Sequence, residues 1–468
     1  MTMNTMTRAL FAAYAYLPGG WRRNVLLEWD ATGTLQTVAA DLPRAPEGAM
    51  RASGPLIPGM PDLHSHAFQR AMAGLTEYRA NPTDSFWSWR DLMYRFAARI
   101  TPDDLGAIAR WLYVEMLKAG YTSVCEFHYV HHAQDGQHYA NRAELAQRVV
   151  DAASETGIGM TMLPVLYQYS GFGALPPRGD QRRFINTPEQ LLALIDTLRS
   201  ARPEHGALRY GVAPHSLRAV SHASLTALLE GLDVMSPGAP VHIHIAEQTA
   251  EVEACLATEN ARPVQWLLDR FDVNERWCLV HATHVDTQET EAIAKSGAVA
   301  GLCLTTEANL GDGIFPAHDY LGAGGAFGVG SDSHIGIDWR AELRLLEYGQ
   351  RLVRRERNVL ASPQTPYVAD RLFDAALVGG ARATGRATGV LAAGARADWI
   401  VLDPAHADLA GQSPQTWLSS IVFCERGETP VLDVYTGGER VVAQRRHRDE
   451  ERLYADYRKV LARLLADA

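Results

Sequence analysis

The stretch Met60-Pro61-Asp62-Leu63-His64-Ser65-His66 ends an apolar run and carries two histidines one residue apart. If Leu63 to His66 are extended, the alternation of side chains along a strand puts both imidazoles on one face. Two imidazoles on one face can bind the same metal ion, although the pair taken alone could equally be two structural histidines. The pair predicts part of a metal site whose other ligands lie elsewhere in the chain.

Eight short apolar runs, of which the first ends at His64, alternate with amphipathic segments. The other seven are residues 122–127, 160–166, 210–213, 241–245, 278–280, 299–304 and 326–330. Between them the periodicity predicts helices over residues 103–119, 143–156, 188–199 and 289–295. This alternation is typical of an α/β protein with parallel strands. Eight repeats favour a closed (β/α)8 barrel of the TIM type, with an open doubly wound sheet as the alternative.

The chain also predicts a smaller domain and a final helix. We assign residues 56–385 to the barrel. Short strands and turns occur in residues 1–55 and again in residues 386–445. Because neither piece is long enough to fold alone, we expect them to pair as one small β-sandwich domain built from both ends of the chain. Residues 446–468 have helical spacing and predict a C-terminal helix.

The composition argues against several classes of protein. The chain has 468 residues and a formal net charge of -10 without a basic stripe, so we expect no nucleic-acid partner. No run approaches the roughly 20 apolar residues that span a bilayer, so we expect no membrane partner. Five widely spaced cysteines without a C-x-x-C pair argue against a disulfide framework. A reducing compartment fits this pattern, and the expected location is the cytoplasm.

Residues suited to metal binding and catalysis gather at the ends of the apolar runs. They are His64, His66, His128, Tyr129, His215, His244, Glu247, His281 and Asp332. In a parallel barrel the carboxyl ends of the strands meet at one face, where active sites of this architecture lie. Structural histidines scattered at random would not repeatedly fall at strand ends. The pattern therefore indicates a functional site.

The segment Val241-His242-Ile243-His244-Ile245-Ala246-Glu247 offers a third metal ligand, and two histidines compete for that role. A carboxylate three residues beyond the ligand can reach a substrate above the metal. We therefore assign His244 to the metal and Glu247 to proton transfer. His242 points the same way one layer deeper, where a hydrogen-bonded core histidine is the favoured interpretation. Asp332, at the end of the eighth run, is the natural oxygen ligand.

His64, His66, His244 and Asp332 together leave one coordination position open for water, which is the pattern of catalytic zinc sites. A divalent metal can lower the pKa of a bound water to about 7. His281, at the end of the sixth run, is expected to orient this water.

The lysines argue for a single metal ion. Some metallohydrolases bridge two metals with a carboxylated lysine from a barrel strand. Here Lys118 and Lys295 fall in helical segments and Lys459 in the C-terminal tail, so no lysine is available at a strand end. We expect one divalent metal. Three imidazoles and a carboxylate can bind zinc, iron, nickel or cobalt, and zinc is the default.

These motifs resemble the amidohydrolase superfamily, and within it the mononuclear deaminase branch. The resemblance rests on the histidine pair after strand one, H-x-x-E after strand five, a histidine after strand six and an aspartate after strand eight. It covers nearly the whole chain, because residues 394–402, with the sequence GARADWIVL, look like the closing strand of the superfamily's flanking β domain. The resemblance implies a metal-dependent hydrolase.

Within this branch the chain resembles members that hydrolyse the formimino group of a dicarboxylate in histidine degradation. The supporting stretches are residues 62–70, 87–90, 213–218, 305–313 and 330–334. The resemblance implies a substrate pocket lined by Gln69, Arg90, Tyr129, His215 and Arg218. The chemistry agrees, because guanidinium groups such as those of Arg90 and Arg218 bind carboxylates in bidentate fashion.

Each acid or base has an expected role. Asp332 accepts a proton from the attacking water, Glu247 passes protons to the departing nitrogen, and His281 stabilises the tetrahedral intermediate. Two alternatives stay open: an aminohydrolase acting on a purine, a pyrimidine or an adenosine derivative, and a catalytically silent barrel used for binding. The sequence does not determine the oligomeric state, and a homodimer is expected only because apolar helices outside a barrel often find a partner.

Overall fold

Nine parallel strands form the centre of the larger domain. The computed structural model describes residues 8–77, 86–424 and 427–466, with the side chains of residues 86–88 left out. Five strands form one sheet: β6 (Met60–Ser65), β7 (Tyr121–His128), β8 (Gly159–Leu166), β9 (Leu208–Tyr210) and β10 (Ala213–Pro214). Four form a second sheet: β11 (Val241–Ile245), β12 (Trp277–His281), β13 (Val299–Leu302) and β14 (Ala326–Val329).

The two parallel sheets meet along both of their edges. Beyond β14, Asp332 forms a bridge with Ser65 of β6, and its N–H donates to the carbonyl of His64 at 2.9 Å. At the opposite edge Val212 bridges Val241 of β11. The predicted α/β fold is confirmed. The parallel strands form two sheets, and isolated bridges join these sheets at both pairs of edges.

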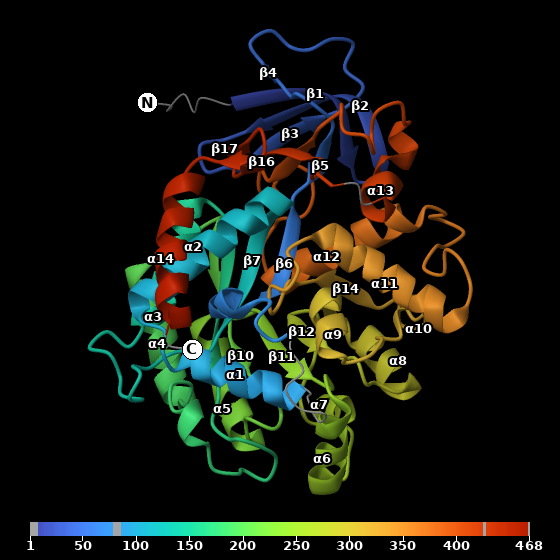
Figure 1. The fold of residues 1–468 in the computed structure, drawn as a ribbon. Coiled ribbons are helices and arrows are strands. Elements are labelled where there is room, and N and C mark those ends of the chain that lie inside the picture. The colour runs from blue at the N-terminus through green and yellow to red at the C-terminus, as the bar shows by residue number, and fades with distance from the viewer. Residues whose placement is uncertain (1–7, 78–85, 425–426, 467–468) are drawn as a thin grey trace.

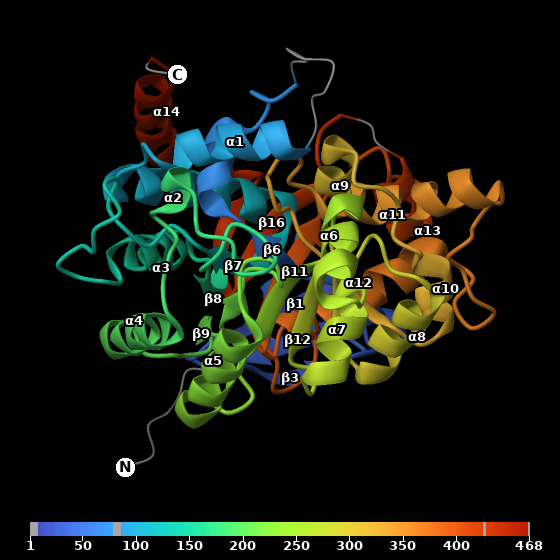
Figure 2. The same ribbon diagram turned by 90° about the horizontal axis from the view of Figure 1, so that it is seen from below.

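Helices surround these two sheets, as Figures 1 and 2 show. They are α1 (Phe86–Ala97), α2 (Pro102–Ala119), α3 (Glu144–Thr156), α4 (Pro188–Ala201), α5 (His222–Met235), α6 (Thr249–Glu259), α7 (Pro263–Arg270), α8 (Thr287–Ser296), α9 (Leu304–Leu310), α10 (Ala317–Gly322), α11 (Trp339–Arg354) and α12 (Val368–Thr384), with two 3-10 turns, η1 (Ala67–Met72) and η2 (Gly179–Gln181). The four helices predicted from periodicity correspond to α2, α3, α4 and α8. Within the described part of the chain, no helix is long and apolar enough to cross a membrane.

Two predicted strands differ from the structure for local reasons. The run 210–213 is divided between β9 and β10, because Gly211 still donates its N–H to Met162 of β8 at 3.0 Å, whereas Val212 donates to the carbonyl of Pro240 at 3.0 Å. The run 299–304 ends early, because the Glu307 carboxylate accepts the N–H of Cys303 at 2.9 Å and turns the chain into α9. A side chain thus satisfies a backbone donor that a longer strand would have paired.

The two ends of the chain combine in one sheet of nine strands, seen at the top of Figure 1. The strands are β1 (Arg8–Leu17), β2 (Gly20–Trp29), β3 (Leu35–Ala39), β4 (Met50–Arg51), β5 (Leu56–Pro58), β15 (Trp399–Leu402), β16 (Val431–Thr436), β17 (Glu439–Ala443) and β18 (Arg446–His447). Trp29 and Trp399 pack edge to face at 5.1 Å between ring centroids in a separate core. The predicted sandwich is therefore one continuous sheet around its own core.

The boundaries of the small domain also differ from the prediction. β5 pairs with both β1 and β15, so the nine-stranded sheet extends past the predicted division at residue 56. A helix, α13 (Pro414–Phe423), lies in the region predicted to hold only strands and turns. The last helix, α14 (Glu450–Ala466), begins after residue 446, because Arg446 and His447 form β18. Tyr454 of α14 packs on Trp111 of α2 at 4.7 Å between ring centroids.

Helix α12 lies against β14 without an intervening side chain. A Cβ atom added at Gly379 would lie 1.9 Å from the carbonyl oxygen of Phe327, so only glycine permits this contact. We expect Gly379→Ala to lower the free energy of unfolding by about 1–3 kcal/mol through overpacking, measured by denaturant titration. The matched control is Gly322→Ala in α10, where an added Cβ has nothing within 4 Å. Equal stability of the two variants would contradict this account of the packing.

Candidate metal centre and its pocket

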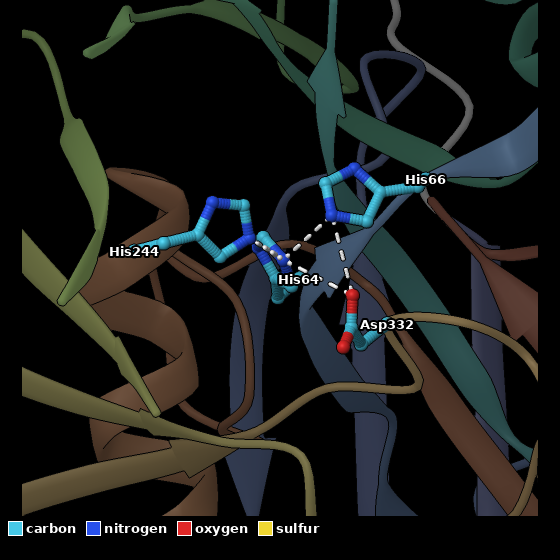
Figure 3. A group of neighbouring side chains, drawn as sticks. All are labelled: His64, His66, His244 and Asp332. Atoms are coloured by element: carbon cyan, nitrogen blue, oxygen red, sulfur yellow. Dashed lines mark hydrogen bonds and ion pairs between the residues drawn. The ribbon is translucent and has the colours of Figure 1, made fainter. Parts of the chain in front are cut away.

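Four potential metal ligands converge at the carboxyl ends of β6 and β11 and just beyond β14, as Figure 3 shows. The Nε2 atom of His64 lies 3.1 Å from Nε2 of His66 and 3.0 Å from Nε2 of His244. Oδ1 of Asp332 lies 3.4 Å from Nε2 of His64 and 3.2 Å from Nε2 of His66. All four side chains are buried. The structure thus brings together the four residues predicted as ligands.

These donor atoms fit a small divalent cation. In a tetrahedral site with bonds of about 2.0–2.1 Å, ligand atoms lie about 3.3 Å from one another, close to the separations found here. Nδ1 of His66 is 2.9 Å from the carbonyl of Phe127, and Nδ1 of His244 is 3.1 Å from the carbonyl of His215. Donation of Nδ1–H to these carbonyls leaves the lone pairs on Nε2. Lone pairs that face each other at this distance repel, and a cation between them removes the repulsion.

The protonation states also suit a metal. Burial lowers the pKa of His64 to about 3, and burial together with the neighbouring imidazoles lowers that of His244 well below its usual range. Burial alone would raise the pKa of Asp332, but hydrogen bonds with His64 and His66 hold it well below its usual range. Neutral imidazoles and an ionised carboxylate are the forms that bind metals.

The backbone around the ligands is fixed and locally strained. The buried carboxylate of Asp62 accepts the N–H of His64 at 3.1 Å and the hydroxyl of Ser331 at 2.6 Å, which ties β6 to the segment after β14. Asp332 has φ 45° and His281 has φ 68°, left-handed conformations that residues other than glycine seldom adopt. Such strain persists only where the surroundings determine the conformation, and it is common at functional sites.

His281 lies between carboxylates on both of its ring nitrogens. Nδ1 is 3.2 Å from Oε1 of Glu307, while Nε2 is 3.8 Å from Oε1 of Glu247 and 3.9 Å from Oδ2 of Asp332. Burial alone lowers the pKa of His281, but these three carboxylates raise it to about 10. Burial raises the pKa of the Glu247 carboxyl. The arrangement holds an imidazole that can donate from Nε2 beside a carboxyl that can carry a proton.

One pocket lies over this centre. All five residues predicted to bind substrate line it: Gln69, Arg90, Tyr129, His215 and Arg218. The Gln69 amide donates to the hydroxyl of Tyr129 at 3.0 Å. The predicted acids and bases Glu247, His281 and Asp332 line the same pocket. Groups that could bind an anion therefore share one cavity with groups that can move protons.

Two further histidines, His242 and His128, lie outside the ligand cluster. His242 makes a hydrogen bond between Nε2 and the carbonyl of Ala383 at 2.9 Å, as expected for a core histidine. His128 is buried beside His131 and does not line the pocket. Sequence reasoning missed further lining residues: Trp89, Met93, Tyr94, Tyr167 and Leu310. It also gave no role to Glu307, although the position of this residue within the stretch 305–313 was a usable signal.

The fold and this set of ligands define a class. The chain belongs to the amidohydrolase family, whose model matches residues 56–441. It is 52% identical over 458 residues to the formimidoylglutamate deiminase of Pseudomonas aeruginosa, an alignment that covers 98% of this chain and 99% of the relative. It is 26% identical to a 5-methylthioadenosine/S-adenosylhomocysteine deaminase of Natronomonas pharaonis, over 87% of this chain and 85% of that one.

Solved structures give the same architecture. A crystal structure of an amidohydrolase from Brucella melitensis has a TM-score of 0.91 at 45% identity and covers 98% of this chain and 100% of its own. An adenosine deaminase from Xanthomonas campestris, solved with bound zinc, has a TM-score of 0.79 at 20% identity and covers 98% of each chain. At that level of identity the second likeness concerns the fold alone.

Proposed function

We propose that this chain hydrolyses N-formimino-L-glutamate to N-formyl-L-glutamate and ammonia, as a step in histidine degradation. The observation that carries the proposal is one pocket that combines the four-ligand cluster with Arg90 and Arg218. The substrate has two carboxylates and one amidine carbon, so it needs cationic partners and a hydrolytic centre in the same cavity. The 52% identity with a formimidoylglutamate deiminase supports this substrate.

The cofactor we propose is one zinc ion held by His64, His66, His244 and Asp332. Three imidazoles and a carboxylate with an open position are the donor set of hydrolytic zinc sites. When bound, such an ion makes a water molecule acidic and polarises the group that is attacked. Among the described residues, the three lysines lie on α2, α8 and α14, away from this cluster, which supports a single ion.

The residues of the chain divide the proton transfers between them. Oδ1 of Asp332 faces the histidine cluster, so Oδ2 is the atom that accepts a proton from the attacking water. Nε2 of His281 donates to the oxygen that forms on the tetrahedral carbon. Glu247 carries a proton to the leaving nitrogen, which departs as ammonia while the carbon keeps the new oxygen. Arg90 and Arg218 bind the carboxylates and orient the amidine carbon.

A rival enzyme would deaminate a purine, a pyrimidine or an adenosine derivative, as the names of several relatives suggest. Two arginines in the pocket disfavour this rival, because a neutral base offers them no anion. Ammonia release from N-formimino-L-glutamate, guanine, cytosine and S-adenosylhomocysteine would distinguish the candidates. Release only from a base or nucleoside would overturn the proposal. A catalytically silent binding barrel would release ammonia from none of these four compounds.

Arg218→Ala is expected to raise the KM for N-formimino-L-glutamate by about 10–100-fold, because a charge-assisted pair with a carboxylate is lost. The measurement is steady-state ammonia release. Arg202→Ala is the control, since Arg202 pairs with Asp151 on the exposed surface. An unchanged KM in Arg218→Ala would show that Arg218 does not bind a carboxylate of the substrate.

We propose that the two parallel sheets act as one (β/α)8 barrel, supported by the bridges that join both pairs of edges. We also expect a homodimer, for which sedimentation of the purified chain is the direct measurement.

A further inference from the structure

Two tyrosine hydroxyls meet a buried glutamine at one wall of the pocket. Tyr94 comes from α1, Tyr167 follows β8, and Gln181 ends η2. The two hydroxyl oxygens lie 3.2 Å apart, and Nε2 of Gln181 lies 3.2 Å from that of Tyr94 and 2.9 Å from that of Tyr167. The three side chains are at most 2% exposed. Both tyrosines line the pocket, whereas Gln181 stands behind them.

The backbone fixes the direction of the Gln181 amide. Its Oε1 accepts the N–H of Arg178 at 2.8 Å, as part of the turn that forms η2. Because Oε1 is occupied on that side, the NH2 group must face the tyrosines. Gln181 therefore acts only as a donor toward both hydroxyls.

This arrangement leaves one tyrosine hydroxyl hydrogen without an acceptor among the three side chains. Each phenol oxygen of Tyr94 and Tyr167 accepts one hydrogen from the amide of Gln181. One phenol then donates to the other, which leaves one hydroxyl hydrogen. Among the described residues, no acceptor takes this last hydrogen. One phenol O–H of the pair, held in place by Gln181, is therefore available to donate a hydrogen bond to a ligand in the pocket.

The charges nearby indicate which ligand group this donor meets. The guanidinium of Arg90 lies 5.6 Å from the ring centroid of Tyr94, and Arg218 lines the same pocket. Burial raises the pKa of Tyr167 well above its usual range, so the phenol stays protonated. A neutral O–H beside two cations is suited to an anionic oxygen acceptor, since both kinds of group donate hydrogen bonds.

We propose that Tyr94 and Tyr167 supply a hydroxyl donor to one carboxylate of the substrate, and that Gln181 is the positioning residue that sets its direction. This inference rests on the proposed function and extends its specificity. The donor helps to select a dicarboxylate over a neutral base, because a hydrogen bond to an anionic oxygen is stronger than one to a neutral acceptor.

The test is Gln181→Glu, which has nearly the same shape and reverses the polarity. A carboxylate at this position accepts both phenol hydrogens, so none is left for the substrate. We expect the KM for N-formimino-L-glutamate to rise about tenfold, with kcat within about threefold, as for loss of one hydrogen bond to a charged group. Should this variant fail to fold, Tyr94→Phe combined with Tyr167→Phe gives the same answer. Tyr167→Phe alone should have a smaller effect, because the hydroxyl of Tyr94 then regains a free hydrogen.

Inhibition constants distinguish the loss of a hydrogen bond to one carboxylate from a general disturbance of the pocket. They are measured for N-formyl-L-glutamate and for two derivatives that each lack one of its carboxylates. In Gln181→Glu, the constants for N-formyl-L-glutamate and for one derivative should rise by about tenfold, while the other derivative, which lacks the carboxylate bound here, is unaffected. Equal changes for all three compounds, or none, would overturn the inference.

The control is Tyr210→Phe, whose buried hydroxyl donates to the carbonyl of Arg202 at 2.8 Å, away from the pocket. It should leave all three inhibition constants unchanged, and a rise equal to that in Gln181→Glu would overturn the inference. If the parent chain releases no ammonia from N-formimino-L-glutamate, the proposed function fails before any variant is compared. If the parent is active and the variants keep its inhibition constants, only the role of the tyrosine pair fails.

Discussion

Glu247→Gln should reduce ammonia release by about 10³-fold, because an amide cannot carry the proton that the leaving nitrogen requires. The side chain keeps its shape, and its Oε1 atom lies 3.8 Å from Nε2 of His281, outside the four-ligand cluster. Metal content should therefore equal that of the parent. Burial already raises the pKa of this carboxyl, which favours a group that takes up and releases a proton.

Metal analysis and single-turnover ammonia release on the same preparation make this prediction decisive. Glu289→Gln is the matched control, because Glu289 is buried and pairs with Arg262 beyond the pocket lining. The control should keep full activity. Full activity in Glu247→Gln would eliminate its proton-transfer role, and loss of metal in that variant would show that the carboxylate supports the ligands instead.

The second large effect is expected at only one of two histidines on the same strand, His244 and not His242. His244→Gln removes an Nε2 atom that lies 3.0 Å from that of His64. We expect metal content to fall to about a tenth or less, and activity to fall with it, because three ligands remain of four. His242→Gln should keep both metal and activity and lower only stability, since His242 contacts the carbonyl of Ala383 in the core.

Metal analysis by mass spectrometry and ammonia release on both variants test the choice between the two imidazoles. The comparison is well matched, because both residues are buried on β11 and differ by two positions. Metal loss in His242→Gln with retention in His244→Gln would reverse the assignment. Equal loss in both would mean that the strand, rather than one imidazole, determines metal binding.

Local pattern was enough to predict most of the parallel strands and the convergence of four potential metal ligands. The strand 241–245 was predicted with the bounds of β11, because a short apolar run next to turn residues has few other interpretations. His64, His244 and Asp332 were found because strand ends in this architecture gather at one face, so the separation of these residues in sequence did not matter.

Features that depend on tertiary contacts could not be predicted in this way. Tyr94 and Tyr167 lie on a helix and a loop, and nothing in their neighbouring residues indicates that they meet. The predicted strand 210–213 is interrupted where Val212 changes its backbone partner from β8 to the segment before β11, and the sequence of the run does not indicate this change. The helix α13 was missed because its region was interpreted as part of the small domain.

The nine-stranded sheet has a consequence for the order in which the protein is made. β5 leads directly into β6, which carries His64, yet its partner β15 belongs to the last part of the chain. Gly59, between these two strands, donates its N–H to the carbonyl of Asp398 at 3.2 Å. During translation the backbone groups at the edge of β5 therefore remain unpaired until β15 is synthesised. Unpaired strand edges of this kind promote aggregation of incompletely folded chains. The segment that leads into the strand carrying His64 therefore gains its last strand partner late in synthesis.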